Sequence, residues 1–454
     1  MRKLLGEIIL LLFLTGCSSI FLSKKDTALK LYLCGLLYED DTGVNEQSFQ
    51  FFKKSFQISG DNPYLCVKLG NISLKKEQIP EAKKYFKQAL WINPENPDAL
   101  FGIGLVYFYE KDLKLATYYI EKGLKKQPEN ISFRIMLCDL YVLNKQYEKA
   151  LAHYDKLLRE FPENYLLHYN CGLIFERLSK HSDAEREYLK ALEISPNFWE
   201  GNFSTGVFYE NQKNYEKASK YYEKAIEINP KHYLPYLLLS NIYSEEKKYE
   251  KVKEILEKGL NEGIRRREFF QILGIIHMDE KNYDKAIQYF EKSIEIEDTT
   301  QSHFYLGIIY DKLKNKEKME EEMTKAINLD PKNSVALNYL GYSYLLENKD
   351  IKKAYQMIQE ACKIEPNNGA FLDSLGWAYF KMKKYRLARK YLEKASTLEK
   401  DPEIFEHLGY LYFEMKDYKK AISWWLKTIE NINDDETKIK EINGLIEKTK
   451  ELIK

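Results

Sequence analysis

Small residues, aromatic residues and a closing proline recur along the chain at a spacing of 34 residues. One copy of this pattern holds Gly206, Tyr209, Ala218, Tyr222, Ala225 and Pro230. The preceding copy holds Gly172, Phe175, Ala184, Tyr188, Ala191 and Pro196. Within a copy the apolar residues lie three or four positions apart, which is the spacing of one face of an α-helix. The pattern therefore predicts pairs of amphipathic helices, and the proline predicts the turn that ends each pair.

Copies of this pattern cover nearly all of the chain. They begin near residues 63, 97, 131, 165, 199, 233, 267, 300, 334, 369 and 402. A degenerate copy at 29–62 precedes them, which makes about twelve in total. A single helix pair cannot bury its apolar faces alone, whereas a stack of pairs buries a continuous core. We therefore predict an all-α solenoid of about twelve helix-turn-helix units.

The copy at 233–266 departs from the pattern. Val252 occupies a slot that holds a small residue elsewhere, and Gly259 and Gly263 stand where the closing proline is expected. Two interpretations are open, a flexible joint between two arrays or a repeat whose sequence has drifted. We place a division of the chain after this copy.

After residue 436 the repeat ends and an apolar stripe follows on a Lys- and Glu-rich segment. The stripe comprises Ile439, Ile442, Leu445, Ile446, Leu452 and Ile453. Such a helix is typical of a cap that covers the last exposed repeat face, and a partner-binding or self-associating helix is the alternative. The predicted arrangement is an N-terminal array at 29–266, a C-terminal array at 267–435 and a capping helix at 436–454.

The first residues have the features of a targeting signal. Arg2 and Lys3 precede an unbroken apolar run at 8–14. This run is too short to cross a bilayer, which needs roughly 20 apolar residues, and it is typical of a secretory signal peptide.

The tetrapeptide LTGC, which ends at Cys17, resembles the lipobox of bacterial lipoproteins. The resemblance implies that 1–17 is a lipoprotein signal peptide, that acyl chains such as palmitate modify Cys17, and that 18–28 is a short tether. Because Ser18 rather than Asp follows the cysteine, it also implies anchoring at the outer membrane, facing the periplasm. An ordinary signal peptide with an incidental cysteine is the alternative.

The 34-residue pattern itself resembles the tetratricopeptide repeat. That resemblance implies a right-handed superhelix whose first helices line a concave groove, and it implies two apolar patches there. The N-terminal patch consists of Phe101, Leu105, Phe108, Tyr109, Ile135, Val142, Leu143, Tyr169 and Leu173. The C-terminal patch consists of Tyr342, Leu345, Leu346, Trp377, Phe380, Tyr410 and Phe413. Polar residues separate the patches, Gln271 among them, and the alternative for several apolar members is packing between adjacent helices.

Composition and motifs narrow the function. The 70 Lys and Arg balance 69 Asp and Glu, so no net field favours nucleic acid. The sequence holds no HExxH, no GxSxG and no phosphate-binding glycine loop. Its six cysteines lack zinc spacing, and the five that follow Cys17 are interpreted as small buried hydrophobes. The Lys, Asn and Arg set that clamps a peptide carboxylate in some proteins of this repeat type is also missing. We expect no catalysis, metal, cofactor or small-molecule substrate, and we expect protein or peptide partners.

The segment 338–395, and above all NGAFLDSLGWAYF at 368–380, resembles the C-terminal repeats of lipid-anchored bacterial proteins. That group includes the LbcA-like adaptors of carboxyl-terminal processing proteases. The resemblance implies a membrane-anchored scaffold that recruits envelope proteins, including a protease and its clients. The alternative is an assembly factor for an envelope machine, such as a pilus secretin or the outer-membrane protein insertion complex.

Overall fold

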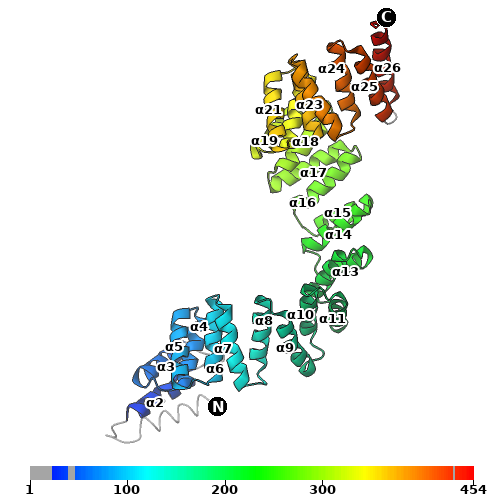
Figure 1. Cartoon of the computed structure of the whole chain (residues 1–454). Helices are drawn as coiled ribbons and strands as arrows, with labels where there is room; N and C mark the ends of the chain where they lie inside the picture. The colour runs from blue at the N-terminus through cyan, green and yellow to red at the C-terminus, as the bar shows by residue number, and fades with distance from the viewer. Residues whose placement is uncertain (1–22, 39–45, 433–434, 454) are drawn as a thin grey trace. The chain divides into compact units, whose positions relative to one another are not determined.

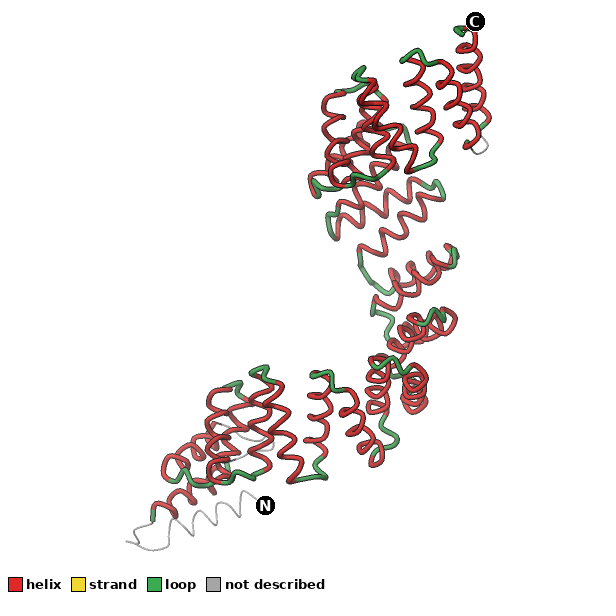
Figure 2. The backbone as a smooth tube through the Cα atoms, in the orientation of Figure 1, coloured by secondary structure: helices red, strands yellow, loops and turns green. Residues whose placement is uncertain are grey.

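The computed structural model describes residues 23–38, 46–432 and 435–453. Within these ranges every regular element is an α-helix, and Figure 2 shows the helices joined by short turns. The predicted all-α class is therefore confirmed for the described part of the chain. None of the helices described is long and apolar enough to span a membrane.

The helices alternate as first and second members of antiparallel pairs. The first helices are α2 (Lys24–Leu37), α4 (Pro63–Lys75), α6 (Pro97–Tyr109), α8 (Ile131–Leu143), α10 (Tyr165–Arg177), α12 (Trp199–Asn211), α14 (Tyr233–Glu245), α16 (Arg267–Asp279), α18 (Thr300–Lys312), α20 (Ser334–Leu346), α22 (Gly369–Lys381) and α24 (Pro402–Glu414). The second helices are α3 (Glu46–Ile58), α5 (Ile79–Ile92), α7 (Leu113–Lys126), α9 (Tyr147–Glu160), α11 (His181–Ile194), α13 (Tyr215–Ile228), α15 (Tyr249–Asn261), α17 (Tyr283–Ile296), α19 (Lys316–Leu329), α21 (Ile351–Ile364), α23 (Tyr385–Leu398) and α25 (Tyr418–Asn431). A further helix, α26 (Glu436–Glu451), follows.

These helices confirm the predicted units and their register. The described residues form twelve pairs, and the predicted start of each copy from 63 onward is the first residue of a first helix, α4 to α24. The chain separates into two compact units, which we call the N-terminal unit (Met1–Ile228) and the C-terminal unit (Asn229–Lys454). Figure 1 shows the pairs following one another in chain order within each unit.

The first pair begins earlier than the sequence pattern indicated. Residues 24–28, expected in the tether, are the first turns of α2, because Ser23 caps this helix. The Ser23 hydroxyl accepts from the Asp26 amide at 3.2 Å, and the Asp26 carboxylate accepts from the Ser23 amide at 3.1 Å. This reciprocal capping box satisfies two free amides at the helix start. The small and aromatic slots on which the prediction rested lie further along the pair and do not report the cap.

The small-residue slots let paired helices approach closely, as predicted. A Cβ added to Gly206 of α12 would lie 2.6 Å from the ring of Tyr222 on α13. Ala218 and Tyr222 themselves are fully buried. The glycine is therefore required by the aromatic ring that packs on it, which explains why the two slots recur together.

From the second pair onward, the turn inside each pair uses an unusual backbone conformation. Positive φ angles occur, from the second pair onward, at Glu77, Lys111, Lys145, Ser179, Lys213, Lys247, Lys281, Lys314, Asn348, Lys383 and Lys416. At Lys213 the φ angle is 59°, and the following amide of Asn214 donates to the Tyr209 carbonyl at 2.9 Å. This left-handed helix ending normally favours glycine, because a side chain there costs about 1–2 kcal/mol.

The 233–266 repeat ends in a glycine turn instead of a proline turn. Gly263 has a φ of 86° and donates to the Leu260 carbonyl at 3.1 Å, and the Ile264 amide reaches back to the Gly259 carbonyl at 3.1 Å. Gly259 also leaves room for Phe269 of the next repeat, whose ring would lie 2.5 Å from an added Cβ. That packing ties this repeat to the one after it. The boundary between the compact units accordingly lies at 228/229, one repeat before the division that we expected after 266.

The final helix covers the end of the last pair. Ile442 and Ile446 of α26 are buried in the same apolar cluster as Trp425 of α25. Leu452 and Ile453, which we expected in the stripe, are exposed beyond the end of the helix. The buried stripe is therefore shorter than predicted, although the capping position of the helix is as expected.

Candidate partner-binding faces

The predicted N-terminal patch lies on three consecutive first helices, α6, α8 and α10. Tyr109, Ile135 and Leu143 have exposed fractions of 59%, 45% and 53%. Leu173 is also exposed, at 36%, and the other members named in the prediction are half-buried: Phe101, Leu105, Phe108, Val142 and Tyr169. Half-buried Phe108 packs edge-on against the exposed ring of Tyr109 with a centroid distance of 6.0 Å, and Phe101 stacks on the buried Phe133 at 4.6 Å. This face keeps an open apolar surface.

The predicted C-terminal patch, on α20, α22 and α24, is largely closed. Leu345 is fully buried and Trp377 is 8% exposed, so both belong to the core of the C-terminal unit and not to an open groove. The other members, Tyr342, Phe380, Tyr410 and Phe413, are half-buried and pack against that core, and Leu346 is exposed. The residues packed around Trp377 explain why Leu345 and Trp377 are buried and do not line an open groove.

The ring of Trp377 is covered by a histidine from the next first helix. Its ring stacks on His407 of α24 with centroids 4.0 Å apart, and on Phe380 at 4.5 Å. The His407 Nδ1 atom lies 2.8 Å from a carboxylate oxygen of Asp373 on α22. Its Nε2 atom lies 3.3 Å from the hydroxyl of Tyr342 on α20. We call Tyr342, Asp373, Trp377 and His407 the C-terminal network, which joins three first helices.

The C-terminal network carries a buried charge. Burial opposes protonation of His407, but the negative charge of Asp373 and its hydrogen bond outweigh burial and raise the pKa of His407 above its ordinary value. Asp373 and Trp377 both fall within the segment 368–380 that we singled out by resemblance. Sequence reasoning missed His407 because its signal, a histidine 34 positions after a carboxylate on an apolar helix, reads as one isolated polar residue.

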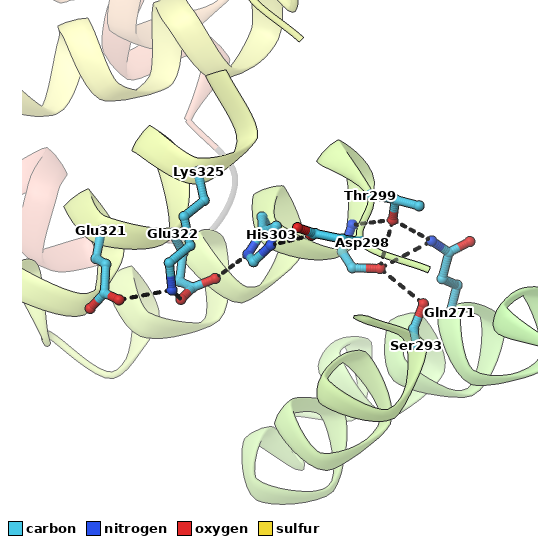
Figure 3. A network of polar contacts seen from close by, with 9 residues as sticks. Gln271, Ser293, Asp298, Thr299, His303, Glu321, Glu322 and Lys325 are labelled. Atoms are coloured by element: carbon cyan, nitrogen blue, oxygen red, sulfur yellow. Dashed lines mark hydrogen bonds and ion pairs between the residues drawn. The ribbon is translucent and has the colours of Figure 1, made fainter. Parts of the chain in front are cut away.

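A second polar network lies in the C-terminal unit across the two consecutive repeats that begin at 267 and 300 (Figure 3). Gln271, which we expected in the polar part of the groove, is buried and donates to the hydroxyls of Thr299 and Ser302 at 3.2 and 3.1 Å. His303 lies between two carboxylates. Its Nε2 atom is 2.7 Å from Asp298 Oδ1, and its Nδ1 atom is 2.5 Å from Glu322 Oε2. The hydrogen bond to Glu322 raises the pKa of His303 more than burial lowers it.

The described cysteines behave as the sequence suggested. Cys34, Cys66, Cys138, Cys171 and Cys362 are all buried and unpaired by disulfides. Burial raises the pKa of Cys66 to about 11 and that of Cys138 to about 12, which makes these thiols poor nucleophiles. Cys17, the predicted lipidation site, lies outside the described residues. No group of three metal-ligating side chains occurs within the described ranges.

Comparison with known families decides the class of the repeat. Models of the tetratricopeptide repeat match the chain at 67–131, 136–197, 203–232, 221–254, 268–300, 300–333, 322–356, 371–402 and 402–430. The chain belongs to the tetratricopeptide repeat family. Tetratricopeptide repeats bind proteins and peptides, so the chain is a protein-binding scaffold of a class that is typically non-catalytic. No curated protein is similar enough to the chain to count as a match.

Several solved structures resemble parts or most of the chain. YrrB, described as a TPR protein with an unusual peptide-binding site, has 23% identity and a TM-score of 0.37 over 40% of this chain and 95% of its own. The pilF protein of Pseudomonas aeruginosa has 22% identity and a TM-score of 0.34 over 40% of this chain and 88% of its own. The Cut9–Hcn1 structure of the APC/C has 15% identity and a TM-score of 0.43 over 94% of this chain and 100% of its own. Likeness at these levels concerns the repeat fold alone.

Proposed function

We propose that the chain is a lipid-anchored scaffold that recruits proteins of the bacterial envelope, and that the N-terminal unit takes the partner. The role of the N-terminal unit in partner binding rests on one observation, the open apolar face on α6, α8 and α10. Exposed Tyr109, Ile135 and Leu143 recur on successive first helices above a half-buried aromatic base. Exposed apolar side chains gathered on one face are a feature of protein interaction sites, and aromatic side chains supply much of the binding free energy there.

The face has a matched control within one repeat. Tyr109 lies on the first helix of the 97–130 repeat and Tyr118 on its second helix, with exposed fractions of 59% and 54%. We expect Tyr109→Ser combined with Ile135→Ser to weaken partner binding at least tenfold, because the two side chains lose apolar contact area in the complex. Tyr118→Ser should leave binding unchanged. Equal losses in both variants would contradict a role for the first-helix face.

The anchor and the compartment rest on the sequence of the first 17 residues. Two or more acyl chains on Cys17 would hold the chain at a membrane, because each buried methylene contributes about 0.8 kcal/mol and a single chain is only marginal. Cys17→Ala should move the protein from the membrane fraction to the soluble fraction. An unchanged membrane fraction would refute lipidation.

The proposed class of partner rests on the resemblance of segment 338–395 to the repeats of lipid-anchored adaptor proteins. A scaffold that holds a processing protease and its client raises the effective concentration of one for the other, without either binding tightly alone. Affinity purification from detergent-solubilised envelopes tests this: a protease recovered together with its hydrolase clients supports the adaptor. Recovery of secretin or insertion-complex subunits instead would show that the chain is an assembly factor. The Tyr109→Ser and Ile135→Ser variant, purified in parallel, separates specific partners from background.

A further inference from the structure

The fourth residue of several first helices makes the same structural hydrogen bond. In four consecutive repeats this residue donates to the carbonyl of the proline that closes the preceding repeat. The Arg134 guanidinium donates to Pro128. The other three pairs are His168 with Pro162 at 2.9 Å, Asn202 with Pro196 at 2.9 Å and Tyr236 with Pro230 at 3.0 Å. Since neutral Asn and Tyr make this bond, the positive charge of Arg134 is not needed for it.

At this position in two other repeats a histidine has a carboxylate partner. The seventh residue of the second helix, 19 positions later, is Glu187 in one repeat and Glu322 in another. Glu187 lies 2.7 Å from His168, and Glu322 lies 2.5 Å from His303, as Figure 3 shows for the latter pair. Each histidine and its carboxylate thus form a pair within one repeat.

The repeat of Arg134 lacks this carboxylate. The corresponding residue is His153, whose pKa is lowered by burial and by Arg134 and Lys156, so that it is neutral near pH 7. Arg134 is only 5% exposed, and of the residues that the structure describes none forms an ion pair with it. An unpaired buried charge is costly for a folded protein. The repeat therefore carries a cation whose counter-charge is missing.

Arg134 and His153 line a cavity of about 850 Å³ formed by α7, α8 and α9. Five basic and three acidic side chains surround it, and the acidic Glu121 is already engaged by the Tyr141 hydroxyl at 2.5 Å. Lys125, Lys149 and Lys156 add positive charge, and Leu124 and Tyr141 add an apolar wall. The volume far exceeds that of a single phosphate or carboxylate group, so a larger ligand with an apolar part fits better.

We propose that this cavity binds an acidic peptide segment of a partner protein, with a glutamate or aspartate carboxylate on Arg134 and an apolar side chain against Leu124 and Tyr141. The guanidinium donates hydrogen bonds in a planar fork that matches a carboxylate. The ligand carboxylate supplies the negative charge that Glu187 and Glu322 supply in the other repeats, because the neutral His153 stands at their position here. This inference rests on the protein-binding role proposed above and adds a second site to it, between helices α7, α8 and α9.

Two variants test the site in the full-length chain, and the probe is a fluorescein-labelled, capped hexapeptide that alternates glutamate with leucine. Arg134→Asn keeps the proline bond, as Asn202 does, but removes the charge. His153→Glu supplies the missing carboxylate, as Glu187 does. We expect both variants to weaken peptide binding at least tenfold, and His153→Glu to raise the Tm because Arg134 gains a partner. The same peptide with glutamine for glutamate should bind wild type at least tenfold more weakly.

Other outcomes overturn the proposal. Equal binding of the glutamate and glutamine peptides, or unchanged binding in both variants, would show that Arg134 receives no carboxylate. Inorganic phosphate that binds in an Arg134-dependent way while the peptide does not would make this a small-anion site. If the Tyr109→Ser and Ile135→Ser variant loses the envelope partner while Arg134→Asn keeps both partner and peptide, the proposed function stands and this inference fails.

Discussion

The first-helix faces of the N-terminal and C-terminal units come from the same repeat positions but differ in how far their apolar residues are exposed to solvent. On α6, α8 and α10 the apolar residues remain open, with Tyr109 and Ile135 exposed. On α20, α22 and α24 the corresponding surface is closed around Trp377, which His407 covers from the next helix. The difference arises from a few polar residues. Asp373 and His407 form a buried pair that draws adjacent first helices together and turns a groove position into core.

The largest expected effect concerns Trp377. Trp377→Ala should lower the free energy of unfolding of the C-terminal unit by about 3–5 kcal/mol, because it leaves a cavity against His407 and Phe380. Denaturant titration followed by circular dichroism measures this loss. Tyr109→Ala in the N-terminal unit is the control and should cost about 0.5 kcal/mol or less. A small loss for Trp377→Ala would mean that its ring lies at an open surface after all.

A pH titration tests the charge inside the C-terminal network. The folded-state pKa of His407 is raised, so its contribution to stability is fully present below the ordinary histidine pKa and is lost as the pH rises through the raised value. Asp373→Asn should remove this contribution and cost about 1.5–3 kcal/mol at low pH. His303 acts in the same direction and His277, whose pKa is lowered by burial, acts in the opposite one, so the informative quantity is the difference between wild type and Asp373→Asn.

The N-terminal unit should respond to pH in the other direction at His153. Its folded-state pKa is lowered, so protonation favours the unfolded state and stability falls as the pH drops through the ordinary histidine range. His153→Gln should flatten this acid-side loss. Hydrogen exchange at amides of α8 and α9, measured between about pH 5 and 7, reports the change locally. An acid-side loss that persists in His153→Gln would assign it to other groups.

The smallest expected effect shows what the two units share. Lys213 and Lys314 both adopt positive φ in the turn inside a pair, one in each unit. Replacing either by glycine relieves the steric cost at that backbone conformation but increases the entropy of the unfolded chain, so we expect a gain of up to about 1 kcal/mol. Thermal unfolding of Lys213→Gly and Lys314→Gly should give similar shifts. Opposite shifts would show that the turns, and not only the faces, differ between the units.

The sequence alone predicted the scaffold closely, because repeat register is a local property. Gly206 and Tyr222 recur together since one ring fills the space beside one glycine, and that spacing is visible in the chain. Whether the apolar residues of each face are exposed or buried was less predictable from the sequence. Whether Trp377 is open or buried depends on His407 in the following repeat, a contact between residues that no helical period links. Likewise, the sequence did not show that Arg134 lacks a counter-charge. That became clear only by comparison with His168, which the structure pairs with Glu187.

Hydroxyl-radical footprinting with mass spectrometry, on the purified chain with and without solubilised envelope proteins, tests the open and closed faces most directly. We predict that Tyr109 and Ile135 are oxidised in the isolated chain and are protected when a partner is bound. Trp377, although its indole is intrinsically more reactive, should stay unmodified in both conditions because it is 8% exposed. Oxidation of Trp377 in the isolated chain, with protection of Trp377 and not of Tyr109 by the envelope proteins, would contradict the account.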